Sequence, residues 1–262
     1  MNEVEILLTD ILKCRRIDLY LNKLSISPEQ KRYILEAIIR RLRLEPLQYI
    51  LGKTEFMGLE FKVASSVFIP RPETEILVEE ALKIICNLKS TDQPLRVLDL
   101  GTGSGCIAIS LAKYASKKIT IDAVDISKEA LELAKLNAEL NKVKVNFFKS
   151  NLFKRLKPLT YDLIVSNPPY LSKKEIPHLS REITYEPPIA LEAGVDGLKF
   201  LYRIIKKAPL YLKEKGYLIL EIGYNQLHPL RNLFENNKYL KIIDIVKDYC
   251  NIERIIVAKK YG

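Results

Sequence analysis

A short apolar strand, a glycine-rich turn and a helical pattern follow one another between residues 96 and 112. The turn carries three alternating glycines, Gly101, Gly103 and Gly105. Glycine lets the backbone approach a bound molecule closely, and such a turn frees N–H groups at the start of the following helix. The pattern therefore predicts an α/β sheet with a nucleotide-type site at this turn. Its spacing lacks the third glycine of the dinucleotide fingerprint, which argues against NAD.

An acid before the turn favours a cationic ligand. Asp99 stands two residues before Gly101, where its charge would repel the two phosphates of a dinucleotide. The same charge would attract a ligand that carries an ammonium and a sulfonium group. S-adenosylmethionine is such a ligand, and we expect it as the cofactor.

The next two predicted strands add polar residues at their ends. Asp125 closes the strand 120–126, and Ser127 is placed to cap a helix that begins at Lys128. Asp125 lies 24 positions after Gly101, near the spacing at which a carboxylate meets ribose hydroxyls, and this contact is preferred to the alternative of a strand-end turn residue. The strand 144–148 leads to Asn151 and Leu152, where an adenine ring is expected beside an apolar side chain.

The sequence Asn167-Pro168-Pro169-Tyr170 directly follows the apolar strand 161–166. Two successive prolines can neither continue a helix nor donate to a sheet, and each pushes the residue before it toward extended geometry. The Asn167 side-chain oxygen and the Pro168 carbonyl are then acceptors suited to an NH2 group, and Tyr170 offers a flat face to a planar substrate. The alternative is a simple turn that ends the strand.

Together these motifs resemble the class I S-adenosylmethionine-dependent methyltransferases, and more narrowly the release-factor glutamine methyltransferases of the HemK/PrmC family. The resemblance covers nearly the whole chain. It also includes residues 46–52 (PLQYILG) and 68–75 (FIPRPETE), which look like linker-region signatures of that family. The implied fold is a Rossmann-like class I methyltransferase sheet of seven strands, mainly parallel with an antiparallel edge, beside a small N-terminal helical domain.

The resemblance also implies roles for individual residues. The turn residues Gly101, Thr102, Gly103, Ser104 and Gly105 would hold the methionine end of S-adenosylmethionine, which becomes S-adenosylhomocysteine. Asp125 would bind the ribose, Asn151 and Leu152 the adenine. Asn151 replaces the family's usual aspartate, and Leu152 stands where a bulkier residue is common. Asn167, Pro168, Pro169 and Tyr170 would form the catalytic and substrate-binding motif, with Asn167 also bordering the cofactor.

In the family that this chain resembles, the segment equivalent to residues 68–75 lies near the substrate entrance. Phe68 would pack on the substrate glutamine, and Arg71 would pair with a carboxylate. The alternative is that this segment is only a proline-punctuated helix start, in which Glu73 favours the positive end of the helix dipole. An irregular stretch at 171–197 is long enough to be a substrate loop. Glu186 and Glu192 within it could form one wall of the site.

The predicted chemistry requires positioning more than a strong base. A carboxamide nitrogen is a poor nucleophile because its lone pair is delocalised into the carbonyl. Hydrogen bonds to Asn167 and to the Pro168 carbonyl are each worth only about 0.5–1.5 kcal/mol net. Holding the nitrogen in line with the methyl group can contribute about 7–11 kcal/mol. The amide proton becomes acidic after methylation and can leave later.

The chain is expected to comprise a helical substrate-docking domain at 1–53, a hairpin linker at 54–73 and the methyltransferase domain at 74–262. Helical spacing and the capping pattern at residues 27–30 predict that the segment 1–53 is helical. Its helices could dock the substrate or simply pack on the catalytic domain. In the methyltransferase domain, a helix is expected at 197–215. Strands at 216–223, 240–247 and 252–258 complete the mainly parallel sheet.

Composition narrows the class of protein. Neither a signal peptide nor a membrane span is visible, so a cytoplasmic enzyme is expected. The four cysteines and two histidines lack ligand spacing, so neither a metal site nor a disulfide framework is expected. The net charge of +10 is the strongest argument for a nucleic-acid substrate, but the lysines are scattered in pairs along the chain, and direct nucleic-acid binding is not required.

The favoured function is therefore N5-methylation of the glutamine in the Gly-Gly-Gln motif of peptide chain release factors, in translation termination, as the resemblance implies. Methylation of an exocyclic amine in RNA or DNA is the main alternative, in which the motif at 167–170 would grip a flipped base. A ribosomal-protein glutamine methyltransferase and a cofactor-binding module without catalysis are the others. The residues leave open which release factor is preferred and whether the protein is monomeric.

Overall fold

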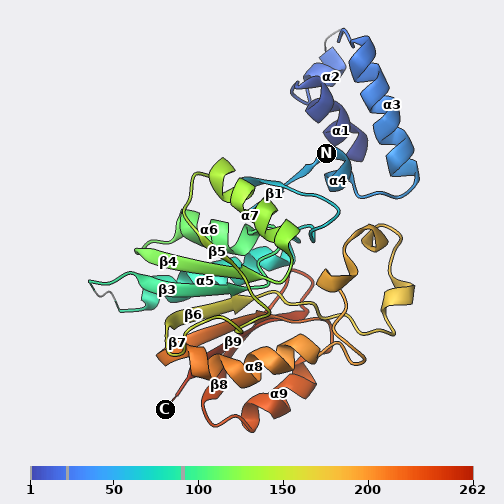
Figure 1. Ribbon diagram of the computed structural model, residues 1–262. Helices are drawn as coiled ribbons and strands as arrows, with labels where there is room; N and C mark the ends of the chain where they lie inside the picture. The colour runs from blue at the N-terminus through green and yellow to red at the C-terminus, as the bar shows by residue number, and fades with distance from the viewer. Residues whose placement is uncertain (1, 22–23, 90–91, 262) are drawn as a thin grey trace.

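The computed structural model describes residues 2–21, 24–89 and 92–261, so the outer limits of the predicted domains at residues 1 and 262 lie outside the described residues. Its centre is a seven-stranded sheet in the order β5-β4-β3-β6-β7-β9-β8 (Figure 1). Its strands are β3 (Leu95–Leu100), β4 (Ile119–Asp125), β5 (Asn146–Lys149), β6 (Tyr161–Ser166), β7 (Leu212–Glu221), β8 (Leu240–Lys247) and β9 (Glu253–Lys260).

The prediction of a seven-stranded, mainly parallel sheet is confirmed. Neighbouring strands from β5 to β7 pair in parallel, and β9 pairs antiparallel with both β7 and β8. The antiparallel strand therefore lies one position inside the edge, and β8 forms the edge itself. Parallel strands point their carboxyl ends to one side of a sheet, where ligands bind in open α/β folds.

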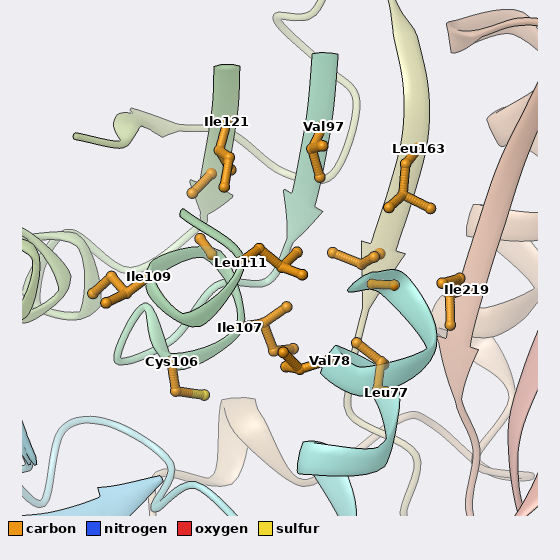
Figure 2. Close-up of a cluster of buried hydrophobic side chains, with 14 of the residues drawn as sticks. Leu77, Val78, Val97, Cys106, Ile107, Ile109, Leu111, Ile121, Leu163 and Ile219 are labelled. Atoms are coloured by element: carbon orange, nitrogen blue, oxygen red, sulfur yellow. The ribbon is translucent and has the colours of Figure 1, made fainter. Parts of the chain in front are cut away.

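Two layers of helices cover the sheet. They are required because successive apolar side chains on each central strand point to opposite faces, so both faces must be buried. Val97 and Leu163 face α5 (Glu73–Asn87) and α6 (Cys106–Tyr114), where Leu77, Ile107 and Leu111 fill the core (Figure 2). Helix α7 (Lys128–Leu140) extends this layer over β4 and β5. The opposite face packs against α8 (Lys199–Tyr211) and α9 (Leu227–Glu235), through the buried cluster that includes Leu98, Ile164 and Leu218.

The N-terminal helices form a separate lobe beyond the sheet (Figure 1). They are α1 (Glu3–Leu12), α2 (Asp18–Leu21), α3 (Pro28–Leu42) and α4 (Leu47–Leu51). The predicted capping box is present, since Ser27 Oγ accepts from the Gln30 N–H and Gln30 Oε1 accepts from the Ser27 N–H. Gly52 ends α4 in the left-handed conformation, with φ of 72°. Both caps confirm the helix limits that the sequence predicted.

The predicted hairpin joins the two lobes. Strands β1 (Lys53–Phe56) and β2 (Leu59–Lys62) are antiparallel and turn at Met57 and Gly58, both with positive φ. Asn137, fully buried on α7, accepts from the Lys62 N–H at 2.7 Å and donates to the Ser104 carbonyl at 2.9 Å. One amide therefore fixes the hairpin against the glycine-rich turn.

Two segments differ from the sequence-based prediction. The helix expected at 197–215 ends at Tyr211, because Leu212 pairs with Tyr161 of β6 and already belongs to β7. Helix α9 was not predicted. The stretch at 171–197 contains three single-turn 3-10 helices, η1 (Ile176–His178), η2 (Ile183–Tyr185) and η3 (Pro188–Ala190). No described helix is long and apolar enough to cross a membrane.

Gly105 shows why one glycine of the turn is needed for packing. It adopts φ of 84° at the start of α6, and a Cβ there would lie 2.9 Å from Ile109 Cδ1 and 3.1 Å from the Ala134 Cβ of α7. A side chain at this position would displace the end of Ile109 and crowd Ala134 of α7. Gly52 has a similar φ of 72° but open space around it.

Gly105→Ala should therefore destabilise the protein by about 2–4 kcal/mol, which combines left-handed strain with overpacking. Gly52→Ala is the matched control and should cost about 1–2 kcal/mol, because only the strain applies. Urea denaturation of both variants measures the difference. Equal losses would show that the α6 and α7 contact tolerates the added carbon.

Candidate functional site

A cavity of about 610 Å³ lies at the carboxyl ends of the central parallel strands. It is bounded by the glycine-rich turn, the end of β4, the motif after β6 and the loop at 171–197. Most of the predicted site residues line it: Phe68, Arg71, Gly101, Thr102, Ser104, Asp125, Asn151, Leu152, Asn167, Pro168, Pro169 and Tyr170. Gly103 and Gly105 are not among the described residues that line it. The structure thus brings together residues as far apart in the sequence as Phe68 and Tyr170.

The glycine-rich turn is held by its own hydrogen bonds. The N–H groups of Gly101 and Thr102 both donate to the Val124 carbonyl, at 2.8 and 3.0 Å. The Gly105 N–H donates to the Thr102 carbonyl at 2.8 Å. The N–H groups of the glycines themselves are not free, since that of Gly103 also donates, to Asp125 Oδ2 at 2.9 Å. These bonds instead fix the shape of the wall that faces the cavity.

Asp99 supports this turn from beneath. Its side chain is fully buried, and Oδ2 accepts a 2.6 Å hydrogen bond from the Thr102 hydroxyl. Oδ1 is buried without a hydrogen-bond partner. Burial raises the pKa of Asp99 to about 7. A buried carboxyl with an unpaired oxygen is stabilised by nearby positive charge, which suits a cationic ligand above the turn.

Asp125 links the turn to the end of β4. Its Oδ2 accepts from the Gly103 N–H and its Oδ1 from the Ser127 N–H, both at 2.9 Å. Burial raises the pKa of Asp125, although these hydrogen bonds act to lower it. Each carboxylate oxygen keeps a second lone pair, so Asp125 can still accept from a pair of ligand hydroxyls. Gly103 therefore acts by orienting this carboxylate.

The end of the cavity near β5 has a wall that the sequence analysis missed. Phe200 and Arg203 of α8 line it, and Arg203 Nη2 donates to Asn151 Oδ1 at 3.0 Å. The Arg203 guanidinium also lies 5.9 Å from the centre of the Phe200 ring. A flat aromatic face beside an apolar Leu152 side chain fits a planar heterocycle. Their spacing of three residues on one helical face was the available signal.

Arg71 pairs with a carboxylate, as expected, and the partner is Glu186 of the loop at 171–197. Glu186 also accepts from the Ile69 N–H at 3.3 Å and is 3% exposed. Burial raises the pKa of Glu186, and Arg71 opposes that rise. The Arg71 guanidinium lies 4.7 Å from the centre of the Phe68 ring. The loop is thereby fixed to the entrance of the cavity.

Asn167 is oriented by a residue that the sequence analysis did not single out. Its Nδ2 donates to the Thr74 hydroxyl at 3.0 Å, and that hydroxyl donates to Glu221 Oε2 at 2.7 Å. This arrangement turns Asn167 Oδ1 away from Thr74. Among the described residues no group of three or more His, Cys, Asp or Glu side chains is placed to hold a metal ion.

Known proteins resemble this chain along its whole length. Residues 78–194 match the family model of the methyltransferase small domain, and residues 1–52 match that of the PrmC N-terminal domain. A release factor glutamine methyltransferase from Fusobacterium nucleatum is 44% identical over 98% of this chain and 73% of its own length. The chain belongs to the release factor glutamine methyltransferase family. A second member, from Thermodesulfovibrio yellowstonii, is 40% identical over 99% of this chain and 92% of its own.

Solved structures support the same fold for this family member. A methyltransferase from Pyrococcus furiosus aligns with a TM-score of 0.57 at 18% identity, covering 90% of this chain and 100% of its own. The catalytic domain of hMettl16, solved with an RNA hairpin, aligns with a TM-score of 0.61 at 16% identity, covering 92% of this chain and 84% of its own. At these identities the likeness shows the methyltransferase fold.

The buried carboxyl of Asp99 should make the stability of this release factor glutamine methyltransferase family member depend on pH. Its folded-state pKa of about 7 lies above the value of about 3.9 for an unfolded aspartate. Its stabilising contribution is therefore complete below about pH 3.9 and is lost as the pH rises through about 7. Relative to wild type, Asp99→Asn should gain about 2–4 kcal/mol in unfolding free energy between about pH 4 and pH 8, measured by urea denaturation.

Asp248 provides a control of opposite sign. Burial acts to raise its pKa, but hydrogen bonds from the Ile252 N–H, Arg254 and the Cys250 N–H outweigh it and lower the pKa. Its stabilising contribution is lost only as the pH falls through that lowered value. Asp248→Asn should therefore be less stable than wild type by a constant amount above about pH 5. A constant difference for Asp99→Asn as well would contradict the assignment of the titration to Asp99.

Proposed function

We propose that this protein methylates the side-chain nitrogen of the glutamine in the Gly-Gly-Gln motif of peptide chain release factors, with S-adenosylmethionine as the donor. The observation that carries the proposal is the orientation of Asn167, whose Nδ2 is held by Thr74 while the residue lines the cavity beside the glycine-rich turn. The names of the family members supply the substrate. Because that substrate acts in translation termination, we also propose that this protein works in the cytoplasm.

The described residues fit S-adenosylmethionine, which supplies a methyl group on a positively charged sulfur. Gly101, Thr102 and Ser104 form the wall suited to the methionine end, above the unpaired oxygen of Asp99. Asp125 can accept from the two ribose hydroxyls. Asn151 and Leu152 line a space suited to adenine together with Phe200 and with Arg203, which donates to Asn151. The hydrogen bonds within the turn hold these groups in place before any ligand binds, which lowers the ordering cost of binding.

The substrate amide is held by acceptors and flat faces. Asn167 Oδ1 and the Pro168 carbonyl accept from its NH2 group, and each bond contributes about 0.5–1.5 kcal/mol net. Tyr170 packs against the amide plane, and Phe68, covered by Arg71, closes the entrance. Correct alignment in a cavity with many apolar side chains contributes more, on the order of 7–11 kcal/mol. The extra proton leaves the methylated nitrogen without a strong base in the motif at 167–170.

The N-terminal lobe at 1–53 is proposed as the docking domain for the release factor, with 54–73 as its linker and 74–262 as the catalytic domain. Several apolar side chains of α3 are more than half exposed, including Leu35 at 60%, Ile39 at 51% and Leu42 at 78%. Apolar surface of this kind is typical of a protein interface. Direct nucleic-acid binding is not required by this arrangement, although the net charge of +10 keeps nucleic acid as the alternative substrate.

Asn167→Ala should reduce methyl transfer to the release-factor glutamine by about 100-fold or more, because misplacing a reacting group carries a penalty of that order. Labelled S-adenosylmethionine is incubated with purified release factor and, in parallel, with total RNA and DNA. Asn236→Ala, at an exposed asparagine after α9, is the control and should keep full activity. Label confined to nucleic acid would overturn the proposal and would indicate that the basic surface binds a nucleic-acid substrate.

Asn151→Asp should bind S-adenosylhomocysteine about three- to tenfold more tightly, since hydrogen bonds to charged groups are stronger than neutral ones. The aspartate would pair with Arg203 and still accept from the adenine amine. Isothermal titration calorimetry measures the affinity, and Asn232→Asp adds the same charge on α9 away from the cavity as the control. Equal affinities for wild type and Asn151→Asp would place the adenine elsewhere.

A further inference from the structure

The end of β7 and the segment after it, residues 221–226, pack behind the motif at 167–170 although the two are more than 50 residues apart. Glu221 ends β7 next to β6 and is 1% exposed. A carboxylate buried this deeply is unfavourable unless hydrogen bonds and positive charge compensate it. The sequence identified this segment only as the end of a buried strand and gave its polar side chains no role.

A chain of two hydrogen bonds joins Glu221 to Asn167. The Thr74 hydroxyl donates to Glu221 Oε2 at 2.7 Å, and Asn167 Nδ2 donates to that same hydroxyl at 3.0 Å. A hydroxyl has a single hydrogen, so a threonine that donates to a carboxylate can only accept from its other neighbour. The asparagine must then present its NH2 group to Thr74. Its oxygen is left on the opposite side of the amide.

We propose that Glu221 and Thr74 are positioning residues that fix the orientation of the Asn167 amide, so that its oxygen faces the substrate NH2 group. This inference rests on the proposed function, because only a substrate that donates hydrogen bonds needs an acceptor at this place. An asparagine amide is nearly symmetric in shape, so packing alone distinguishes its two orientations poorly. The carboxylate breaks the symmetry because it can only accept.

The charge state of Glu221 matters for this arrangement. Burial raises the pKa of Glu221 to about 7, while the Thr74 hydroxyl, Arg254 and the Asn167 side chain act to lower it. Protonated Glu221 could donate to Thr74, whose hydrogen would then be free to turn toward Asn167. Activity should therefore decline as the pH falls below about 7. The other titratable groups that interact with Glu221 are Glu73, Tyr170 and Cys106.

Gln226 holds the other end of the motif. Its Nε2 donates to the Tyr170 carbonyl at 2.8 Å, while its Oε1 accepts from the Gly223 N–H at 2.9 Å. A Cβ on Gly223 would lie 2.9 Å from Tyr170 Cδ2, so only glycine lets the tyrosine ring pack this closely. The end of β7 thus fixes both Asn167 and Tyr170, and the Glu221 contact is part of a continuous support.

Steady-state kinetics on the full-length protein with a release factor as substrate can test the proposal. Thr74→Val and Glu221→Leu should each lower kcat/KM for the release factor about 10- to 100-fold, because a buried polar partner is lost. Thr74→Ser keeps the hydroxyl and should stay within about threefold of wild type. The double variant should lose little more than either single variant, since both break one chain of bonds.

Two further measurements separate positioning from a general structural role. The affinity for S-adenosylhomocysteine, measured by calorimetry, should change less than about threefold in Glu221→Leu, because Glu221 does not line the cavity. Thermal unfolding should remain cooperative. The part of the decline toward low pH that comes from Glu221 should disappear in Glu221→Leu, and any part that comes from Asp99 should remain. In NMR titrations, Thr74→Val should raise the pKa of the Glu221 carboxyl and Thr74→Ser should leave it unchanged.

The outcomes that overturn the proposal are specific. Thr74→Val with wild-type kcat/KM would do so, as would a Thr74→Ser variant as impaired as Thr74→Val. A parallel loss of cofactor affinity in every variant would show a structural role only. If the wild-type protein methylates no glutamine at all, the proposed function fails. The NMR titrations still test the hydrogen-bond chain in that case, and an unchanged pKa of Glu221 in Thr74→Val would exclude it.

Discussion

The parallel pairing of β3 with β6 is the constraint on which the site depends. Apolar side chains on both faces fix this register, which places Val97 opposite Leu163 and Asp99 opposite Val165. The Ser166 hydroxyl donates to the Leu100 carbonyl at 2.7 Å, directly where both strands end. The glycine-rich turn and the motif at 167–170 must therefore emerge side by side. A shift of one residue would reverse every side chain and separate the two halves of the cavity.

Two buried carboxyl groups, near the ends of β3 and β7, lower the stability of the fold while they support the site. Burial raises the pKa values of Asp99 and Glu221 to about 7, so ionising either group works against the fold. A hydrogen bond from a threonine hydroxyl partly offsets the cost of burying each carboxylate. Thr102 donates to Asp99 at 2.6 Å, and Thr74 donates to Glu221 at 2.7 Å. In each case the hydroxyl belongs to a residue that lines the cavity. The carboxylates thus set the direction of hydrogen bonds at the cavity wall without facing it themselves.

The strand ends and their motifs could be predicted from the sequence because they depend on local patterns. The strand at 161–166, the cap at Ser127 and the turn at Gly58 follow from apolar runs, capping residues and glycine. The partners of these motifs depend on tertiary packing instead. Thr74 is 93 residues from Asn167, and the wall formed by Phe200 and Arg203 belongs to a helix whose period only indicated a buried face. Helix α9 was missed, and the end of α8 was misplaced because pairing with Tyr161 outweighs helical periodicity.

The loop at 171–197 connects the two lobes through ion pairs of very different strength. Arg41 of α3 pairs with Glu182 at 2.6 Å, where both side chains remain partly exposed, and such pairs are worth about 0–1 kcal/mol. Arg71 pairs with Glu186, whose side chain is 1% exposed, and breaking a buried pair costs about 3–5 kcal/mol. A movement of the N-terminal lobe would therefore break the contact to Glu182 first. The part of the loop beside Glu186, which carries Pro187 and Pro188 on the cavity wall, would keep its place.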